Sequence, residues 1–387
     1  MAFKEMAKLK VLDKTPAEMG YSFPPEWAPH TGTWFSWPRP EGISFPGKYH
    51  TVPENLARIM CEIQAREQVH INVPNENWAY LVRSQLTEHD CPTKNVFFHH
   101  IKTNESWCRD HGPAFVVRRR KMRTKKATKA EGAIVDWGFN AWGGKYPPYD
   151  DDDAVPTRIG NELKLPVFYP RRGSVVAAGG SPRASAPGDD CVVMEGGAVD
   201  FNGAGTVLTT TDCLLNKNRN PGLSKERIEQ YLKDYYGQKH VCWLTGGIEG
   251  DDTDGHIDDL ARFISPRKIV IGIEDDPKDD NYRILRSARR QLDKLRDQDG
   301  QPFEIVEIPM PRPVTHARQR LPATYVNFYF VNGALLVPTY RDRASDRKAL
   351  KILQSHLPKH QVIGIDCTEL IWGLGAIHCL TQQQPKF

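Results

Sequence analysis

Short apolar runs separated by turn signals recur along the chain, and pairs of runs are followed by segments with helical periodicity. The clearest copy predicts strands at 197–201 and 206–210, with Asn202-Gly203 between them. Asn-Gly between two apolar runs is a strong hairpin signal. Ser224, a favourable N-cap residue, then predicts the start of a helix.

The same plan returns near the C-terminal end of the chain. Strands are predicted at 325–331 and 334–338 around Asn332-Gly333, and a helix is predicted to begin after Ser345. Three looser copies have their predicted elements at 31–37, 52–64 and 69–73; at 107–117 and 133–137; and at 259–265, 268–273 and 281–296. None of these five units could bury its apolar face alone, so we expect them to pack around a common centre. The prediction is one α/β domain over 1–387, because no change in composition marks a linker.

Three segments depart from this plan. Residues 118–130 include RRRKMRTKK without interleaved aromatic residues, which favours a solvated hairpin loop over a nucleic-acid patch. Residues 171–190 are rich in Gly, Ala, Ser and Pro and are predicted to form a surface insertion. The run Asp150–Asp153 favours a solvated turn over a cation site.

Charge and cysteine spacing narrow the classes of function. The 52 basic and 48 acidic residues leave a net charge of +4, too small at this length to indicate a nucleic-acid or membrane-surface partner. No apolar run approaches 18 residues, and the lysine-bearing start has no signal-like core, so we expect a cytoplasmic protein with reduced thiols. Eight cysteines without a CxxC pair predict no zinc site of the usual spacing, and no metal or cofactor is expected.

Five polar residues lie in strand-like or strand-end contexts and carry the candidate chemistry: Asp110, Glu195, His256, Asp258 and Cys379. His256 and Asp258 are two positions apart, so a strand would place both side chains on one face. A thiol beside His and carboxylate groups can serve as a nucleophile, and a structural cysteine remains the alternative. A metal hydrolase built on His256 and the neighbouring acids is a further alternative.

These motifs resemble the agmatine deiminase and bacterial peptidylarginine deiminase-like family of guanidine-modifying enzymes, over about residues 19–385. In chain order the matching motifs are Gly20-Tyr21 with 24–27 (PPEW), 104–113 (NESWCRDHGP), 140–144 (NAWGG), 195–197 (EGG), 213–221 (CLLNKNRNP), 251–263 (DDTDGHIDDLARF), 325–329 (YVNFY) and 377–385 (IHCLTQQQP). The resemblance implies a five-bladed α/β propeller of pseudo-fivefold symmetry, the pentein fold, in agreement with the five units counted above.

The resemblance also implies a reaction and a role for each polar residue. The family cleaves a guanidinium C–N bond, which releases ammonia and leaves a ureido product. Asp110 and Asp258 match the pair that grips the planar cation, which carboxylates bind bidentately. Cys379 matches the nucleophile that forms a covalent thiouronium intermediate. His256 matches the general acid and base, and Glu195 the acid that orients and charges it.

Roles are also expected for four residues close to these five in the sequence. Trp107 is expected to wall the site along the alkyl stem of the substrate, with a core aromatic as the alternative. Gly375, shortly before the nucleophile, is expected to allow close approach of the substrate. Cys108 and His378 are expected to point away from the site on extended strands and to serve packing only.

The preferred substrate of this resemblance is agmatine, converted to N-carbamoylputrescine and ammonia. Arginine or peptidylarginine, giving citrulline, is the alternative, because the segments after Trp37-Pro38 and at 373–376 depart from the pattern of agmatine-specific members. The acids at 150–153 favour an amine end, whereas Arg39, Arg318 and Arg320 favour a carboxylate. A silent guanidinium-binding protein is the alternative of another class. Relatives in the family are often dimers or larger homo-oligomers.

Overall fold

The structure is a computed structural model that describes residues 14–121, 128–172 and 191–387. Its strands form five sheets of three or four strands and one small hairpin in these residues. Within each sheet the strands are given in the order in which they are hydrogen-bonded. The four-stranded sheet consists of β18 (Gln382–Pro385), β1 (His30–Ser36), β2 (Gln68–Val73) and β3 (Val96–His100). The three-stranded sheets are β4 (Ala114–Lys121), β5 (Thr128–Val135), β6 (Val167–Phe168); β7 (Val199–Phe201), β8 (Thr206–Thr210), β9 (His240–Leu244); β10 (Ala261–Ser265), β11 (Lys268–Ile273), β12 (Glu304–Pro309); and β15 (Tyr329–Val331), β16 (Ala334–Thr339), β17 (Gln361–Asp366). The hairpin consists of β13 (Thr315–His316) and β14 (Gln319–Arg320).

All five sheets share one hydrogen-bonding plan. The first strand of each sheet runs antiparallel to the second, and the second runs parallel to the third. In the four-stranded sheet the first strand is β18, so the C-terminal end of the chain completes the sheet that begins the fold. The internal repeats predicted from the apolar runs are therefore real repeats of local topology.

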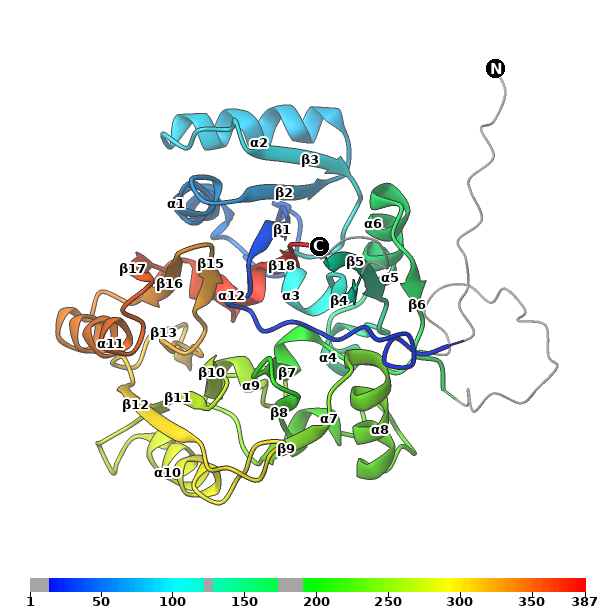
Figure 1. The fold of residues 1–387 in the computed structure, drawn as a ribbon. Coiled ribbons are helices and arrows are strands. Elements are labelled where there is room, and N and C mark those ends of the chain that lie inside the picture. The colour runs from blue at the N-terminus through cyan, green and yellow to red at the C-terminus, as the bar shows by residue number, and fades with distance from the viewer. Residues whose placement is uncertain (1–13, 122–127, 173–190) are drawn as a thin grey trace.

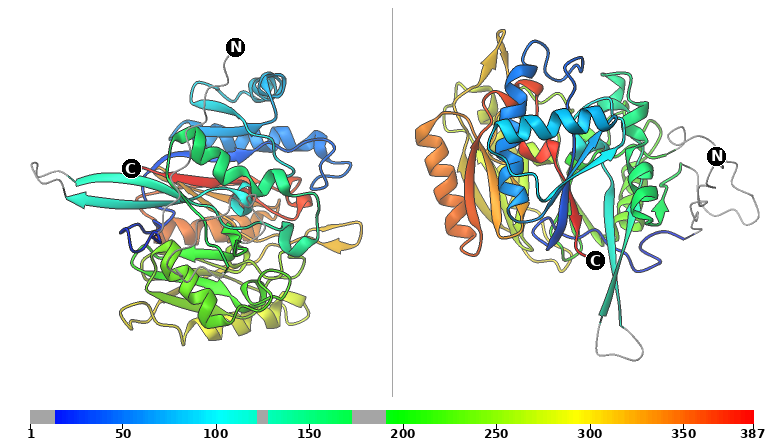
Figure 2. Two further views of the ribbon diagram at one scale, coloured as in Figure 1. Left: turned by 90° about the vertical axis from the view of Figure 1, so that its right-hand side faces the viewer. Right: turned by 90° about the horizontal axis from the view of Figure 1, so that it is seen from above.

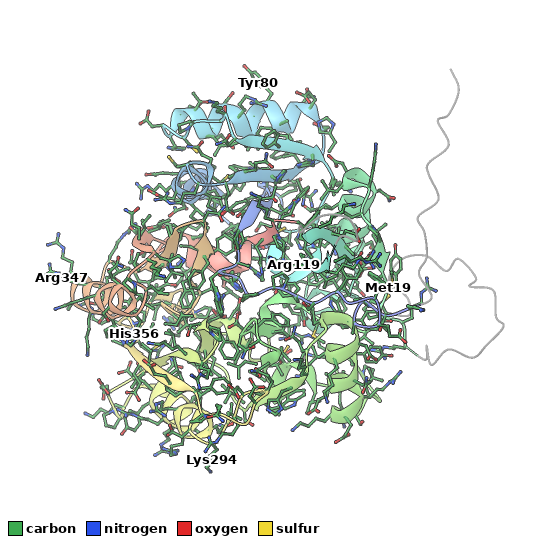
Figure 3. All side chains as sticks on the ribbon, in the orientation of Figure 1. Met19, Tyr80, Arg119, Lys294, Arg347 and His356 are labelled. Atoms are coloured by element: carbon green, nitrogen blue, oxygen red, sulfur yellow. The ribbon has the colours of Figure 1, made fainter. Side chains whose placement is uncertain are left out.

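A helix joins every parallel pair of strands, as a crossover of this length requires. The long helices are α1 (Val52–Gln64), α2 (Glu76–Glu88), α6 (Val155–Leu163), α8 (Lys225–Tyr236), α10 (Asp280–Leu292) and α11 (Arg343–His356). Each one buries an apolar stripe and exposes charged residues. Figure 3 shows this at the rim, where the labelled Tyr80 of α2 and Arg347 of α11 point outward.

Several helical segments are short turns of three or four residues. They are α3 (Cys108–His111), α4 (Ala141–Gly144), α5 (Asp150–Asp153), α7 (Thr211–Leu214), α9 (Ile257–Leu260), α12 (Ile377–Leu380) and the 3-10 turns η1 (Tyr49–Thr51), η2 (Gly196–Ala198) and η3 (Leu370–Gly373). Figure 1 shows the sheets arranged around the middle of the molecule, where α3, α9 and α12 lie. The turn α3 packs against both α12 and η2, and α9 packs against η2.

The distal parts of β4 and β5 form a two-stranded ribbon that projects from the body, as both views of Figure 2 show. The structure thus confirms a hairpin at 118–130 for the residues it describes there. The predicted insertion at 171–190 lies outside the described residues beyond 172. Among the helices of the described residues, none combines the length and apolar character needed to cross a bilayer.

Several predicted elements are confirmed and others are wrong in detail. The predicted bounds 52–64, 206–210 and 268–273 agree with α1, β8 and β11, and Ser224 caps α8 through its side chain. The helix predicted after Ser345 begins at Arg343 instead, because Asp342 accepts the capping bond. The strand predicted at 107–117 begins only at Ala114, since 108–111 turns into helix α3.

Candidate active site

A polar side chain of the candidate site lies within four residues before the first strand of each sheet. These side chains are Asp110 before β4, Glu195 before β7, Asp258 before β10, Asn327 before β15 and Cys379 before β18. Equivalent ends of the five sheets meet at the centre, so residues far apart in sequence become neighbours there (Figure 1). The repeated topology therefore assembles the candidate site.

A cavity of about 240 Å³ opens onto this centre. Cys379 and Asp110 both line it, together with Trp107 and Gly375. His256 and Asp258 lie behind this surface, and both are fully buried. Four of the five residues predicted to carry the chemistry are thus brought together around one cavity.

Cys379 lies in the helical turn α12 and is 7% exposed. Nδ2 of Asn327 donates a hydrogen bond of 3.1 Å to Sγ, and Sγ lies 3.8 Å from Oδ2 of Asp258. Oδ1 of Asn327 accepts a bond of 3.0 Å from the backbone N–H of His378. One amide therefore fixes both the sulfur and the turn that carries it.

The Asp110 carboxylate is held by two neutral donors. Nε1 of Trp142 donates to Oδ2 and the backbone N–H of Gly197 donates to Oδ1, both at 2.9 Å. Burial raises the pKa of Asp110, and the charge of His256 opposes this shift. Among the described residues no hydrogen bond reaches this carboxylate from a cationic donor, so a planar cation in the cavity would complete its environment.

Asp258 is oriented from one side only. Nδ1 of His378 donates to its Oδ2 at 2.6 Å, whereas Oδ1 has no hydrogen-bond partner in the described residues. Burial by itself raises the pKa of Asp258, but the bond and charge of His378 outweigh burial and lower the pKa. Asp258 is therefore an anion with one oxygen left free.

His256 precedes α9 as its N-cap residue, and its backbone N–H bonds Asp251 and Thr253 at 3.1 Å. Its Nδ1 lies 3.8 Å from Oδ1 of Asp110 and 3.9 Å from Oδ1 of Asp258. Neither ring nitrogen has a hydrogen-bond partner among the described residues. Burial alone lowers the pKa of His256, but the surrounding carboxylates outweigh burial and raise it.

Glu195 is fully buried beside His256 and contributes to its raised pKa. Its Oε1 accepts a bond of 2.6 Å from Nε of Arg219, and Sγ of Cys213 lies 3.8 Å from Oε2. No hydrogen bond between Glu195 and His256 is formed in the described residues. The proximity of Glu195 supports its predicted effect on the charge of His256. Its predicted role in orienting His256 stays a prediction.

The resting thiol of Cys379 is held in its neutral form. Burial raises its pKa well above the ordinary range, and the carboxylates of Asp258, Asp259 and Asp110 raise it further. A cation placed between these carboxylates would favour the thiolate.

The wall of the cavity next to the sulfur is made by Trp107 and Gly375. Trp107 packs in the core, and its Nε1 donates to Oγ of Ser44 at 2.8 Å. A Cβ atom on Gly375 would lie 2.4 Å from Cζ3 of Trp107 and 3.0 Å from Cβ of Cys379. Only glycine leaves this space open, because real Cβ contacts are essentially never that short.

Some sequence predictions about the site are wrong. His256 and Asp258 flank the start of the turn α9 rather than sharing a strand, so strand alternation does not explain their proximity. His378 lies in α12 and points at Asp258, not away from the site. Cys108, by contrast, packs in an apolar cluster as predicted.

The charged segments proposed to read the far end of the substrate lie elsewhere. The run Asp150–Asp153 is the helix α5 and not a solvated turn. Asp152 is buried there and accepts the backbone N–H of Asn104 at 2.7 Å. None of Arg39, Arg318 and Arg320 lines the cavity in the described residues, whereas Asp252 does.

No role was predicted for Asn327 or Trp142, although both lie in motifs that carry the family resemblance. The signal that could have found Asn327 is the repeat itself, because it holds the position equivalent to the other four polar residues.

Two sets of three side chains have possible metal-ligand atoms within 4.8 Å of one another: Glu195, Cys213 and His256; and Asp258, Asp259 and Cys379. In the first set, the guanidinium of Arg219 already pairs with Glu195. A second cation beside that pair would be repelled, which disfavours a metal there.

Comparison with known proteins agrees with this geometry. The agmatine deiminase of Medicago truncatula is 35% identical over 97% of this chain and 99% of its own length. That of Pseudomonas syringae pv. tomato is also 35% identical, with the same coverage. The solved agmatine deiminase of Enterococcus faecalis superposes with a TM-score of 0.83 at 30% identity, covering 98% of this chain and 100% of that one. A cysteine-to-serine variant of the C. jejuni agmatine deiminase, with substrate bound, gives 0.78 at 30% identity, covering 95% and 96%.

The sequence matches the family described as Porphyromonas-type peptidyl-arginine deiminase over residues 22–385, which is nearly the whole chain. The chain belongs to this family.

Proposed function

We propose that this protein is an agmatine deiminase, a hydrolase that converts agmatine and water to N-carbamoylputrescine and ammonia. The observation that carries the proposal is the single cavity shared by Cys379 and Asp110, with His256 and Asp258 directly behind it. Such an enzyme needs a nucleophile, a proton-transfer group and two carboxylates around one planar cation.

Substrate binding places the guanidinium between Asp110 and Asp258. Asp110 enters with both oxygens oriented, and Asp258 offers its free Oδ1. The bound positive charge lowers the pKa of the neighbouring Cys379 thiol, which burial and carboxylates otherwise raise. The substrate thus helps to form the nucleophile that attacks it.

As the substrate binds, the Cys379 thiol releases its proton to solvent, because His256 already carries the proton needed for the leaving group. The thiolate then attacks the central guanidinium carbon, and an S–C bond forms. The C–N bond to one terminal nitrogen breaks, and His256, whose pKa is raised, supplies the proton with which ammonia leaves. His256 then takes a proton from water, whose oxygen attacks the thiouronium carbon. The S–C bond breaks, and the ureido product departs from the restored cysteine.

The outer part of the cavity favours a substrate that ends in an amine. Asp252 and Tyr146 line it, and the Tyr146 hydroxyl donates to the Asp252 carboxylate. None of the described residues that line the cavity is an arginine or a lysine. Among the described lining residues only His316 could become cationic, and desolvation and the charge of Lys48 lower its pKa. Nζ of Lys145, 3.6 Å from Asp252, is already paired with that carboxylate. This supports agmatine over arginine.

The five sheets of common topology, set around the middle of the molecule, support the finer proposal of a five-bladed propeller of the pentein type. Each of the five sheets supplies at least one polar residue to the centre, which is consistent with such a fold.

The proposal is tested by incubating the protein with agmatine, free arginine and a short arginine peptide, and measuring the ureido product of each. We expect turnover of agmatine at the highest kcat/KM. Turnover of only arginine or only the peptide would show that agmatine is not the substrate. If none of the three releases ammonia, the deiminase proposal is wrong and an inactive guanidinium-binding protein is favoured. A parallel series with a chelator tests the metal hydrolase, which predicts loss of activity.

A further inference from the structure

His378 connects the substrate clamp to a buried ionic network that the reaction above does not use. Its side chain is 2% exposed, and its two ring nitrogens face two different carboxylates. Nδ1 lies 2.6 Å from Oδ2 of Asp258, and Nε2 lies 2.8 Å from Oε2 of Glu26. A carboxylate only accepts hydrogen bonds, so a ring between two ionised carboxylates donates from both nitrogens.

Glu26 is a fixed anchor for the outer nitrogen. Nη2 of Arg262 lies 3.0 Å and Nη2 of Arg109 lies 3.3 Å from its Oε2. Its Oε1 accepts the backbone N–H of Phe330 at 2.8 Å. Burial would raise the pKa of Glu26, but Arg262 and His378 outweigh it, and the pKa is lowered. Glu26 therefore stays ionised.

Arg262 also connects this anchor to the core. Nε of Arg262 donates to Oδ1 of Asp200 at 3.1 Å, and its Nη1 donates to the carbonyl of Phe328 at 2.7 Å. Three carboxylates, of Asp258, Glu26 and Asp200, thus face the imidazole of His378 and the guanidinium groups of Arg109 and Arg262. A network balanced in this way is stiff, because moving one member leaves another buried charge unpaired.

This network constrains the orientation of the Asp258 carboxylate. His378 holds Oδ2, and Oδ1 remains without a partner in the described residues, 3.9 Å from His256. Oδ2 also receives longer contacts from Nδ2 of Asn327 at 3.4 Å and Sγ of Cys379 at 3.8 Å, so the bond from His378 is the shortest one that fixes the carboxylate. Without that bond the carboxylate could rotate more freely. A buried acceptor left open in a native structure calls for a ligand donor.

We propose that His378 is a positioning residue for substrate recognition, which grips Oδ2 of Asp258 from the Glu26 anchor so that Oδ1 is aimed at a guanidinium N–H. The inference rests on the proposed function, because it supplies that reaction with its second carboxylate in a defined orientation. His378 contacts no reacting atom itself. Its loss therefore acts on substrate binding more than on the thiol.

Two amide substitutions test this with opposite expectations. In His378→Asn the amide nitrogen takes the place of Nδ1 and still donates to Asp258, so the KM for agmatine stays within about 3-fold of wild type. In His378→Gln the amide nitrogen takes the place of Nε2 and faces Glu26. The grip on Asp258 is lost, and KM rises about 10- to 100-fold. Equal KM values in the two folded variants, or a smaller KM for Gln, would overturn the proposal.

Three further readouts keep the test decisive. A matched control is His70→Asn, which removes another buried histidine whose ring stacks on Trp34, and which should lower the melting temperature with KM unchanged.

If wild type fails to convert agmatine, the proposed function fails. The variants are then compared by the concentration of guanidinium chloride at which the rate of Cys379 alkylation by iodoacetamide changes, which needs no turnover and is expected to follow the same order as KM. If a variant does not fold, ¹⁵N NMR of wild-type His378 decides: a proton on Nδ1 supports the proposal, and an unprotonated Nδ1 refutes it.

Discussion

Oδ1 of Asp110 lies 3.8 Å from Nδ1 of His256, and Gly197 occupies the space beside both atoms. A Cβ atom on Gly197 would lie 2.5 Å from this Nδ1 and 2.9 Å from this Oδ1. The carboxylate and the proton-transfer group can approach each other only because this position has no side chain.

Substitution of Gly197 by alanine should therefore displace the reacting groups. We expect kcat/KM to fall on the order of 10²-fold, the effect of a misplacement of about 1 Å. The control is Gly138→Ala, whose nearest contact would be 3.3 Å from Cβ of Cys191, outside the cavity. Steady-state kinetics of both variants measure the difference, and equal activities would refute this geometry.

Replacing Asp110 by asparagine removes one negative charge from the clamp and keeps its shape. The amide oxygen can still accept from Trp142 or Gly197, so the fold should survive. We expect kcat/KM for agmatine to fall on the order of 10²–10³-fold, since a buried cation would lose a charged partner. Asp136→Asn, a buried carboxylate bonded to Thr157 outside the cavity, is the control and should keep its activity.

The pH dependence of kcat/KM should show the raised pKa of His256. The protonated ring protonates ammonia, so activity falls on the alkaline side as pH rises through this pKa, above the ordinary value of about 6.5. The sign for stability is the same. A raised pKa means that the folded protein holds the proton more tightly, so this contribution is full below about 6.5 and lost as pH rises through the folded pKa. A pH–rate profile measures the first effect, and an alkaline limb below pH 6.5 would contradict it.

Substitution of Asp252 by asparagine tests how the cavity reads the amine end. The variant should raise KM for agmatine about 5- to 10-fold, because one charge attraction near the surface is lost. Weak turnover of arginine, if present, should rise or stay constant, since a substrate carboxylate would meet less repulsion. A KM for agmatine equal to that of wild type would show that Asp252 does not contact the substrate.

Local signals were sufficient for much of the fold. Asn332-Gly333 turns between β15 and β16, and Ser224 caps α8, because hairpin and cap chemistry act within a few residues. The repeat of these units led to five sheets. The failures were at the sheet ends, where 256–260 and 377–380 form short turns that packing imposes against the apparent strand pattern.

The residues of the site were harder to derive from local pattern. Cys379, His256, Asp110 and Asp258 could be named from motifs, but no spacing shows that they converge from three different sheets. His378 was taken as a packing residue because a strand would have pointed it away, whereas a helical turn directs it to Asp258. The run Asp150–Asp153 is acidic for a structural reason that only the fold reveals: Asp152 and Asp153 accept backbone N–H groups of Asn104 and Phe139.

The central claim is that Cys379 forms a covalent bond with the guanidinium carbon. The most direct measurement is mass spectrometry of the protein quenched in acid during turnover of agmatine, compared with Cys379→Ser. We expect an adduct on the Cys379 peptide with the mass of agmatine less ammonia, and a loss of turnover of at least about 10³-fold in the serine variant. Unchanged turnover in Cys379→Ser, with no adduct in wild type, would contradict the account.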